Sequence, residues 1–251
     1  MQKILCPVDF KDASLNAVNY AAHLAKQVGA NLTFLYVIPE ERPIVEEPGI
    51  MDEIIAQKEE ARPELEILCE ETTRNFGVST DYLIQVSILK MEVEKVAEEG
   101  NYDLVVMGTG GVTTVDHYFF GSNASKVAEN CSCPVITVPK DFYRTEVQNI
   151  VYASNYQTKD DFYIQQILEL SKVVNASITV LHVSKVSEPF GEELFESVTN
   201  QIRKEFQFDY KQDIKFERVV YEDVEEGLRN YLYDHNVDLV AVLTKHRNFL
   251  E

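Results

Sequence analysis

Short apolar runs alternate with longer amphipathic segments along the first 140 residues of this 251-residue chain. Apolar runs of about five to eight residues predict strands, and an apolar stripe that recurs every three or four positions predicts a helix. Such a stripe runs from Leu15 to Val28 within residues 12–30, and Gly29 stands where a helix commonly stops. The alternation is typical of a parallel sheet covered by helices. Strands are predicted at residues 2–8, 31–37, 80–86, 103–107 and 134–138.

Two segments of this first half depart from the simple pattern. Residues 50–76 are strongly charged and contain Pro63, and proline costs about 3 kcal/mol in a helix interior. We therefore expect this helix to break near Arg62. Residues 39–49, PEERPIVEEPG, combine prolines, a glycine and like charges, which favours a loop over the edge of the sheet.

The pattern of the first half is repeated in the second half. Two segments recur 146 positions later and a third recurs 135 positions later, so the second copy is about 11 residues shorter in its middle. The repeat predicts two α/β domains, at residues 1–142 and 147–251. The second copy stops opposite residues 112–116, and we expect it to lack the counterpart of one helix and one strand. The matched segments are 4–9 with 150–155, 31–37 with 177–183, and 103–106 with 238–241.

The composition narrows the range of partners. The chain carries 42 acidic and 23 basic side chains, and its formal net charge of -19 would repel nucleic acid and anionic membranes. It contains no apolar run near the roughly 20 residues that a membrane span needs, and its first residues do not fit a signal peptide. We therefore expect a cytoplasmic protein that binds neither nucleic acid nor membranes.

The four cysteines form neither a disulfide framework nor a zinc motif. Cys131 and Cys133 are separated by one serine, and two interpretations of them stay open. The pair could be redox-active, or the two side chains could be small apolar residues that pack where the chain enters a strand.

Four of the ten glycines lie between residues 108 and 121, after the apolar run 103–107. Gly108 follows the predicted strand, Gly111 comes three residues later, and Gly121 opens an amphipathic helix. Glycine permits positive φ and a close approach of backbone N–H groups to a ligand. The start of a helix adds unpaired N–H donors and about half a positive charge. A phosphate group fits such a place.

Asp9 is expected at the same edge of the sheet, because it follows the first predicted strand and the carboxyl ends of parallel strands meet at one edge. A carboxylate there can accept hydrogen bonds from a ribose hydroxyl or an adenine amine. Val8 and Val37 would form an apolar slot for the base. Two segments that are far apart in the sequence therefore converge on a nucleotide-shaped site.

The spacing G-x2-G-x9-G-S differs from the P-loop and from the dinucleotide-binding fingerprint. Together with PVDF at residues 7–10 and SCPVITVP at residues 132–139, it resembles the universal stress protein family, and the repeat is similar to a tandem member. The resemblance implies two Rossmann-like domains of the adenine nucleotide α-hydrolase-like type. Each would have a parallel five-stranded sheet with helices on both faces, the second being incomplete. It also implies a regulatory function in the stress response.

The resemblance further implies how the first repeat would hold ATP, ADP or AMP. Asp9 would bind the ribose or the base, and the amides at the start of the helix would hold the phosphates, with the Ser122 hydroxyl on a phosphate oxygen. Mg²⁺ or Mn²⁺ could accompany a triphosphate. The implied binding residues are Pro7, Val8, Asp9, Val37, Met107, Gly108, Gly111, Gly121, Ser122, Asn123 and Ala124.

The second repeat has different residues at the matching positions. Asn155 stands in place of Asp9, and Leu243 in place of Gly108. Leucine does not adopt positive φ cheaply and would fill space that a phosphate needs. We therefore expect no nucleotide in the second repeat.

The sequence also bears on how the protein assembles and on whether it is an enzyme. Residues 135–138 form the last strand of the first repeat, and an exposed edge there would recruit a second copy, which predicts a homodimer. Two alternatives to a nucleotide-binding regulator stay open: an interaction scaffold that binds no nucleotide, and slow ATP hydrolysis. His117 is the single histidine near the glycine motif, and no catalytic or metal-ligating residue is assigned.

Overall fold

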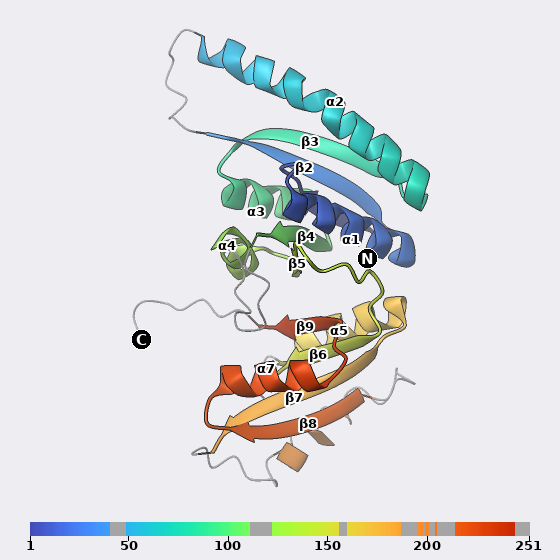
Figure 1. Cartoon of the computed structure of the whole chain (residues 1–251), viewed down its shortest axis with the longest axis vertical. Coiled ribbons are helices and arrows are strands. Elements are labelled where there is room, and N and C mark those ends of the chain that lie inside the picture. The colour runs from blue at the N-terminus through green and yellow to red at the C-terminus, as the bar shows by residue number, and fades with distance from the viewer. Residues whose placement is uncertain are drawn as a thin grey trace. The chain divides into compact units, whose positions relative to one another are not determined.

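The computed structural model describes residues 1–40, 49–110, 122–155, 160–186, 195–197, 199, 200, 204 and 214–243. The chain divides into two compact units, one formed by Met1–Thr145 and the other beginning at Glu146 (Figure 1). Both are α/β units built on a parallel sheet, as the alternating pattern predicts.

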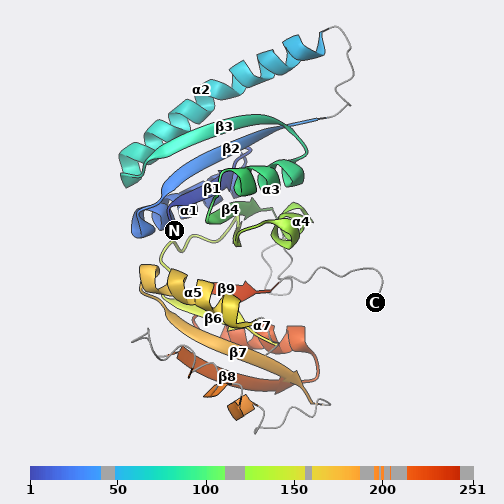
Figure 2. The ribbon, with the colours of Figure 1, turned by 180° about the vertical axis from the view of Figure 1, so that it is seen from behind.

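The first unit is a five-stranded parallel sheet in the order β3-β2-β1-β4-β5. Helices α1 and α2 contact each other on one face, and α3 and α4 contact each other on the opposite face (Figure 2). The strands are β1 (Lys3–Pro7), β2 (Asn31–Pro39), β3 (Thr80–Ser87), β4 (Leu104–Thr109) and β5 (Val135–Pro139). The helices are α1 (Asp12–Val28), α2 (Ile50–Phe76), α3 (Leu89–Glu99) and α4 (Ser122–Asn130). All five predicted strands are confirmed.

The second unit repeats this arrangement with a four-stranded parallel sheet in the order β8-β7-β6-β9, counted over the described residues. Lys3 pairs with Asn31 in the first sheet, and Asn149 pairs with Ser177 in the second, so the internal repeat holds at the level of strand register. The strands are β6 (Asn149–Ala153), β7 (Ser177–Lys185), β8 (Ile214–Tyr221) and β9 (Leu239–Val242), and helices α5 (Asp160–Val174) and α7 (Val224–Asp234) pack against this sheet.

One aspartate in each unit holds the beginning of a central strand. The Oδ2 atom of Asp103 accepts a hydrogen bond from the backbone N–H of Lys3 at 2.9 Å and another from the preceding residue. The Oδ2 atom of Asp238 likewise accepts from the N–H of Asn149 at 3.0 Å and from the residue before it. We call these two groups the aspartate clamps. They explain why the Asp-Leu-Val segments are matched between the repeats.

A hydrophobic core of the first unit, called here the α3/α4 core, lies between the sheet and helices α3 and α4. Leu5, Leu35 and Val105 are fully buried there, together with Val93 and Val127 from the two helices. The alternation of the strands places these residues on one face of the sheet, while their neighbours in the sequence face α1. The packing therefore fixes which strand residues can reach a ligand and which cannot.

Helix α2 differs from its prediction. It is continuous through Pro63, so the expected break near Arg62 is wrong. Tyr82 of β3 contacts the helix on both sides of the proline: Arg62 Nη1 donates to Tyr82 Oη at 3.4 Å, and Tyr82 Oη donates to Glu66 Oε1 at 3.2 Å. Leu65 is also fully buried. Tertiary packing therefore outweighs the local cost of the proline.

The predicted loop at residues 39–49 is only partly open to comparison, because residues 41–48 lie outside the described residues. The predicted end of the first helix is confirmed: Gly29 follows α1 with φ 70°, and its N–H donates to the carbonyl of Ala25.

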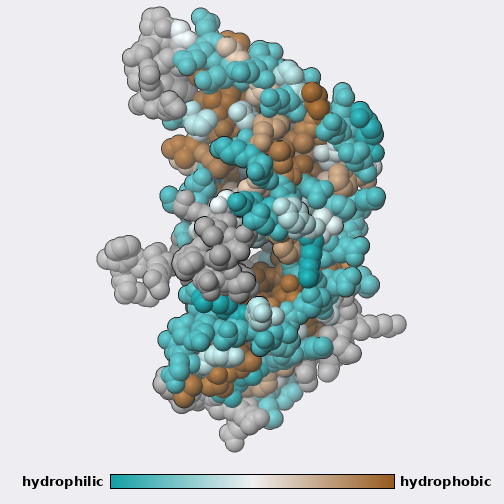
Figure 3. Space-filling view, in the orientation of Figure 1, coloured by the Kyte–Doolittle hydropathy of each residue, from teal (hydrophilic) through white to brown (hydrophobic). Residues whose placement is uncertain are grey.

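The surface in Figure 3 is mostly hydrophilic, with hydrophobic residues gathered in patches. Two large apolar side chains, Ile88 and Met91, are exposed where α3 begins. Among the described residues, no helix combines the length and the apolar character needed to cross a lipid bilayer.

Candidate functional site

The candidate site lies at the carboxyl ends of β1 and β4, where the order in which strands are added to the first sheet reverses. Successive strands are added on one side of β1 up to β3, and the chain then returns to place β4 on the other side. The ladder between β1 and β4 reaches only Leu5 and Val105, whereas β1 pairs with β2 as far as Pro7 and Leu35. Strand β4 continues beside β5 as far as Thr109. The carboxyl ends of β1 and β4 therefore part, and ligands of open α/β sheets bind in such a crevice.

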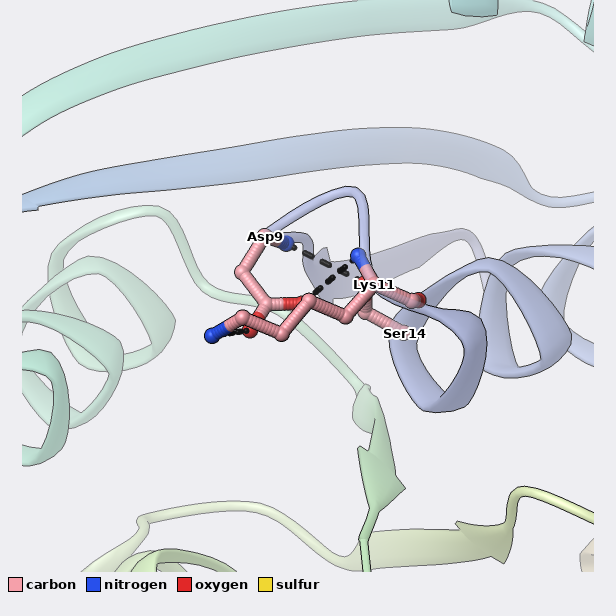
Figure 4. Close-up of polar contacts among 3 residues, drawn as sticks. All are labelled: Asp9, Lys11 and Ser14. Atoms are coloured by element: carbon pink, nitrogen blue, oxygen red, sulfur yellow. Dashed lines mark hydrogen bonds and ion pairs between the residues drawn. The ribbon is translucent and has the colours of Figure 1, made fainter.

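Asp9 lies at this edge, in the loop between β1 and α1 (Figure 4). Its Oδ1 atom accepts a hydrogen bond from the backbone N–H of Lys11 at 3.2 Å, and its Oδ2 atom is 3.1 Å from Lys11 Nζ. The Asp9 backbone N–H donates to Ser14 Oγ at 3.2 Å, and that hydroxyl donates to the Lys11 carbonyl at 3.0 Å. These contacts fix the loop while the Asp9 side chain stays 54% exposed.

The Asp9 carboxyl is held in its charged form. Partial burial acts to raise its pKa, but hydrogen bonds from Ser14 and Lys11 and the positive charge of Lys11 outweigh that effect and lower the pKa below its ordinary value. The Lys11 side chain is 81% exposed, so this ion pair contributes little stability and can be exchanged for a ligand contact. Asp9 is therefore an ionised acceptor that a ligand can reach.

The loop also contains a strained residue. Phe10 has φ 59°, in the left-handed region that bulky side chains rarely adopt. Its ring lies 5.7 Å, centroid to centroid, from the ring of Tyr36 on β2. Such strain persists only where the surroundings hold it, and it concentrates at functional sites.

Gly108 is required by the packing of helix α1. A Cβ atom at this position would lie 2.2 Å from the carbonyl oxygen of Ala13 and 2.8 Å from the backbone nitrogen of Ser14. The glycine therefore allows the first turn of α1 to rest against β4. At Gly110, by contrast, an added Cβ would meet nothing within 4 Å, so this position faces open space beyond the end of β4.

The other predicted site residues divide into exposed and buried ones. Pro7 and Val8 are buried, and Val37 is half-buried at the end of β2. The side chains of Met107 and Ala124 are 4% and 2% exposed and belong to the α3/α4 core, which leaves only their backbone atoms for a ligand. Asn123, in the first turn of α4, is exposed. Gly111, Gly121 and the Ser122 side chain lie outside the described residues.

Two residues of this loop, Lys11 and Ser14, were not among the predicted site residues. Ser14 shapes the loop, and Lys11 brings a positive charge to the edge of the sheet beside Asp9. Their spacing of two and five residues from Asp9 is a usable signal, because a carboxylate commonly bonds the backbone two residues on when a helix follows.

The equivalent edge of the second unit has different chemistry. Asn155 replaces Asp9 there and is exposed, and the Ser154 N–H donates to the Leu181 carbonyl as Val8 does to its partner in the first unit. The buried His182 ring contacts the Ser154 carbonyl through Nδ1 at 2.9 Å, so this histidine is part of the packed interior of the second unit.

Metal-binding side chains are not clustered in the described ranges. No group of three or more His, Cys, Asp or Glu side chains that could hold a metal ion occurs among them.

Two parallel α/β repeats, the first with a charged acceptor at its switch point, define a tandem Rossmann-like protein. The sequence profile of the universal stress protein family matches residues 1–139, more than half of the chain. The chain belongs to the universal stress protein family.

Individual relatives agree with this assignment. The chain is 31% identical over 145 residues to "Universal stress protein MJ0531" of Methanocaldococcus jannaschii, a match that covers 55% of this chain and 82% of that protein. It is 30% identical over 146 residues to "Universal stress protein YxiE" of Bacillus subtilis, covering 54% of this chain and 97% of that protein.

A solved structure extends the likeness to both units. A universal stress protein from Archaeoglobus fulgidus DSM 4304 matches 96% of this chain and 86% of its own with a TM-score of 0.78, at 16% sequence identity. At that identity the likeness concerns the fold, and it supports the tandem arrangement of two such repeats.

Proposed function

We propose that the first unit binds an adenine nucleotide, and that the protein is a stress-response regulator whose occupancy changes the surface it presents to partners. The observation that carries the proposal is the ionised, half-exposed Asp9 at the crevice where β1 and β4 part, with the open Gly110 at the end of β4. Membership of the universal stress protein family supports the same ligand class.

Each part of the nucleotide would meet a different segment. Asp9 accepts hydrogen bonds from the ribose hydroxyls or the adenine amine, and Val37 offers an apolar surface to the base. The backbone amides at the start of α4 would hold the phosphates. Lys11 supplies a positive charge once it leaves its exposed pair with Asp9.

AMP, ADP and ATP differ in the charge that the site must balance. Lys11 and the start of α4 suit one or two phosphates, and Mg²⁺ or Mn²⁺ would accompany a triphosphate. The second unit, with Asn155 and Leu243 at the matching positions, would bind none of them. One nucleotide per chain is therefore expected.

Isothermal titration with ATP, ADP and AMP tests the proposal, with GTP as a control for the base. The Asp9→Ala variant should bind at least about tenfold more weakly, because it loses hydrogen bonds to a charged acceptor. The matched control is Asn155→Ala in the second unit, which should leave the affinity unchanged. Absence of both heat and a thermal shift with all three adenine nucleotides would refute the proposal.

One observation favours a second candidate, an interaction scaffold that binds no nucleotide. Packing against Ala13 accounts for Gly108 without any ligand. If the protein is a scaffold, Asp9→Ala should leave every interaction with partner proteins intact. If it is a nucleotide-dependent regulator, the variant should lose the interactions that require bound nucleotide. Pull-down of partners with and without added nucleotide separates the two functions.

We also propose that the protein forms a homodimer through β5. Within the described residues β5 pairs with β4 on one side only, and an open edge strand is a template for pairing. Light scattering should give twice the mass of one 28.7 kDa chain. A mass equal to a single chain at micromolar concentration would contradict the dimer.

A further inference from the structure

Cys131 and Cys133 form a thiol pair at the junction between α4 and β5. Their Sγ atoms are 3.8 Å apart and are in hydrogen-bonding contact. The backbone N–H of Cys131 donates to the Val127 carbonyl at 2.9 Å, which closes the last turn of α4 and holds the first cysteine in place. Cys133 lies two residues before β5. The two sulfur atoms are thus held next to each other by the elements on either side.

The pair is accessible, and it is the one place among the described residues where two accessible thiols are neighbours. Both side chains are half-buried and pack against the edge of the α3/α4 core, and the residues Ser132 and Pro134 around them are exposed. Cys6 is fully buried in β1. Cys69 is half-buried on α2 and belongs to the helix pair of the opposite sheet face. Small reagents can therefore reach one adjacent pair of thiols and one isolated thiol.

The environment favours a reactive Cys131. The hydrogen bond from Cys133 lowers the pKa of the Cys131 thiol to about 7, against the opposing effects of burial and of the Glu94 charge on α3. The same contact raises the pKa of Cys133, which keeps that thiol protonated. Burial raises the pKa of Cys6 to about 12. The thiolate is the nucleophilic form, so Cys131 is the member of the pair that attacks.

We propose that Cys131 and Cys133 form an oxidation site that a hydroperoxide, such as hydrogen peroxide, converts into an intramolecular disulfide. This site is separate from the nucleotide crevice and does not depend on the proposed ligand. A disulfide needs an S–S distance of about 2.05 Å, so the sulfur atoms must approach by less than 2 Å from their present 3.8 Å.

The reaction proceeds in two balanced steps. The Cys131 thiolate attacks one oxygen of hydrogen peroxide, the O–O bond breaks, and the products are a Cys131 sulfenic acid and hydroxide. The sulfur is oxidised by two electrons, and the peroxide is reduced. The hydroxide released in the first step removes the proton of Cys133 as water, the resulting Cys133 thiolate attacks the Cys131 sulfur, the S–O bond breaks, and hydroxide leaves. A dithiol reductant reverses the outcome by thiol–disulfide exchange.

The disulfide would act on α4. Cys131 follows the last turn of the helix whose buried residues Ala124 and Val127 pack into the core, so a bond to the residue before β5 changes how the end of α4 can move. The expected consequence is a change in the amide hydrogen exchange of α4 between the reduced and the oxidised protein.

Peptide mapping of the intact full-length protein after treatment with stoichiometric hydrogen peroxide tests the site. The expected product is a Cys131–Cys133 peptide that has lost two hydrogen atoms and regains them with dithiothreitol, while Cys6 and Cys69 stay reduced. In the reduced protein, iodoacetamide at pH 7 should alkylate Cys131 at least about tenfold faster than Cys69. A peptide that stays fully reduced, equal reactivity of Cys69, or a disulfide between two chains would overturn the proposal.

Variants separate the roles of the two sulfur atoms. Cys133→Ser should stop the reaction at the sulfenic acid, which dimedone traps, and Cys131→Ser should abolish the fast oxidation. The matched control Cys69→Ser should behave as the wild type does. Circular dichroism checks that each variant is folded, and the wild-type peptide map decides the outcome if one of them is not. A Cys131→Ser variant that oxidises at the wild-type rate would contradict the assignment of Cys131 as the nucleophile.

Discussion

Gly108 is a residue whose identity is set by a backbone neighbour. We predict that Gly108→Ala lowers the free energy of unfolding by about 2 kcal/mol, because the new methyl group would meet the Ala13 carbonyl at 2.2 Å and the start of α1 must shift. Gly110→Ala is the control, and it should change the free energy by less than about 0.5 kcal/mol, because nothing lies within 4 Å. Urea denaturation measures both. Equal effects at the two positions would show that α1 does not constrain β4.

Asp103 gives a prediction for the dependence of stability on pH. Burial acts to raise its pKa, but hydrogen bonds from the backbone of Gln2 and Lys3 and nearby positive charge lower it below its ordinary value. A carboxyl with a lowered pKa stabilises the fold above its unfolded pKa, and the contribution disappears as the pH falls through the folded pKa.

The Asp103→Ala variant should therefore be about 1 kcal/mol less stable than the wild type at pH 7. The difference should shrink as the pH is lowered below about 4. Glu60→Ala, an exposed position on α2, is the control and should follow the wild type at every pH. The test is urea denaturation over this pH range. A difference that grows toward acid would give the opposite sign and exclude the clamp as its cause.

Helix α2 shows how a single strand residue can hold an unfavourable element together. Tyr82 contacts the helix before and after Pro63, through Arg62 and Glu66. The low helix propensity of proline predicts a break in the helix. The contacts of α2 with β3 stabilise the continuous helix instead.

We predict that Pro63→Ala raises the free energy of unfolding by up to about 3 kcal/mol, because alanine restores a backbone donor and removes the clash with the preceding turn. The neighbouring exposed variant Glu64→Ala should have little effect. Thermal and urea unfolding provide the measurement. A less stable Pro63→Ala protein would mean that the curvature imposed by the proline is needed for the contact with β3.

The sequence predicts most of the fold because its apolar residues recur at clear strand and helix spacings. Strands such as β2 and β5 lie within two residues of their predicted ends. It also places Asp9 and Gly108 at the ends of neighbouring strands. It does not predict the close approach of Gly108 to the Ala13 backbone, because the distance between α1 and β4 depends on how the helix packs against the sheet. The burial of Met107 likewise depends on which face α4 covers.

At the scale of the whole molecule, the two units share a plan and differ in detail. Their central strands pair in the same register, and each begins at an aspartate clamp. Each unit has its own buried cluster on the corresponding sheet face. A unit with a complete sheet and its own core has what a domain needs in order to fold alone.

We predict that a fragment of residues 1–142 folds without the second repeat and binds an adenine nucleotide as the full chain does. Cooperative urea unfolding and dispersed amide resonances report folding, and isothermal titration compares the affinities. The full chain carrying Asp9→Ala is the control for loss of binding in an otherwise complete protein. A fragment that aggregates or unfolds without cooperativity would show that the first unit depends on the second.

The aspartate clamps hold the beginning of the central strands, whereas Asp9 follows the end of β1, so the two kinds of site are separated by the length of the strand. Substitutions at sites so far apart usually have additive effects on free energy. The residues after β1 and β4 can therefore be changed to bind a different ligand while the clamps keep the strands in place. The duplicated chain offers a protein engineer two such sheets, and the second already has Leu243 and Asn155 in place of the glycine and the carboxylate.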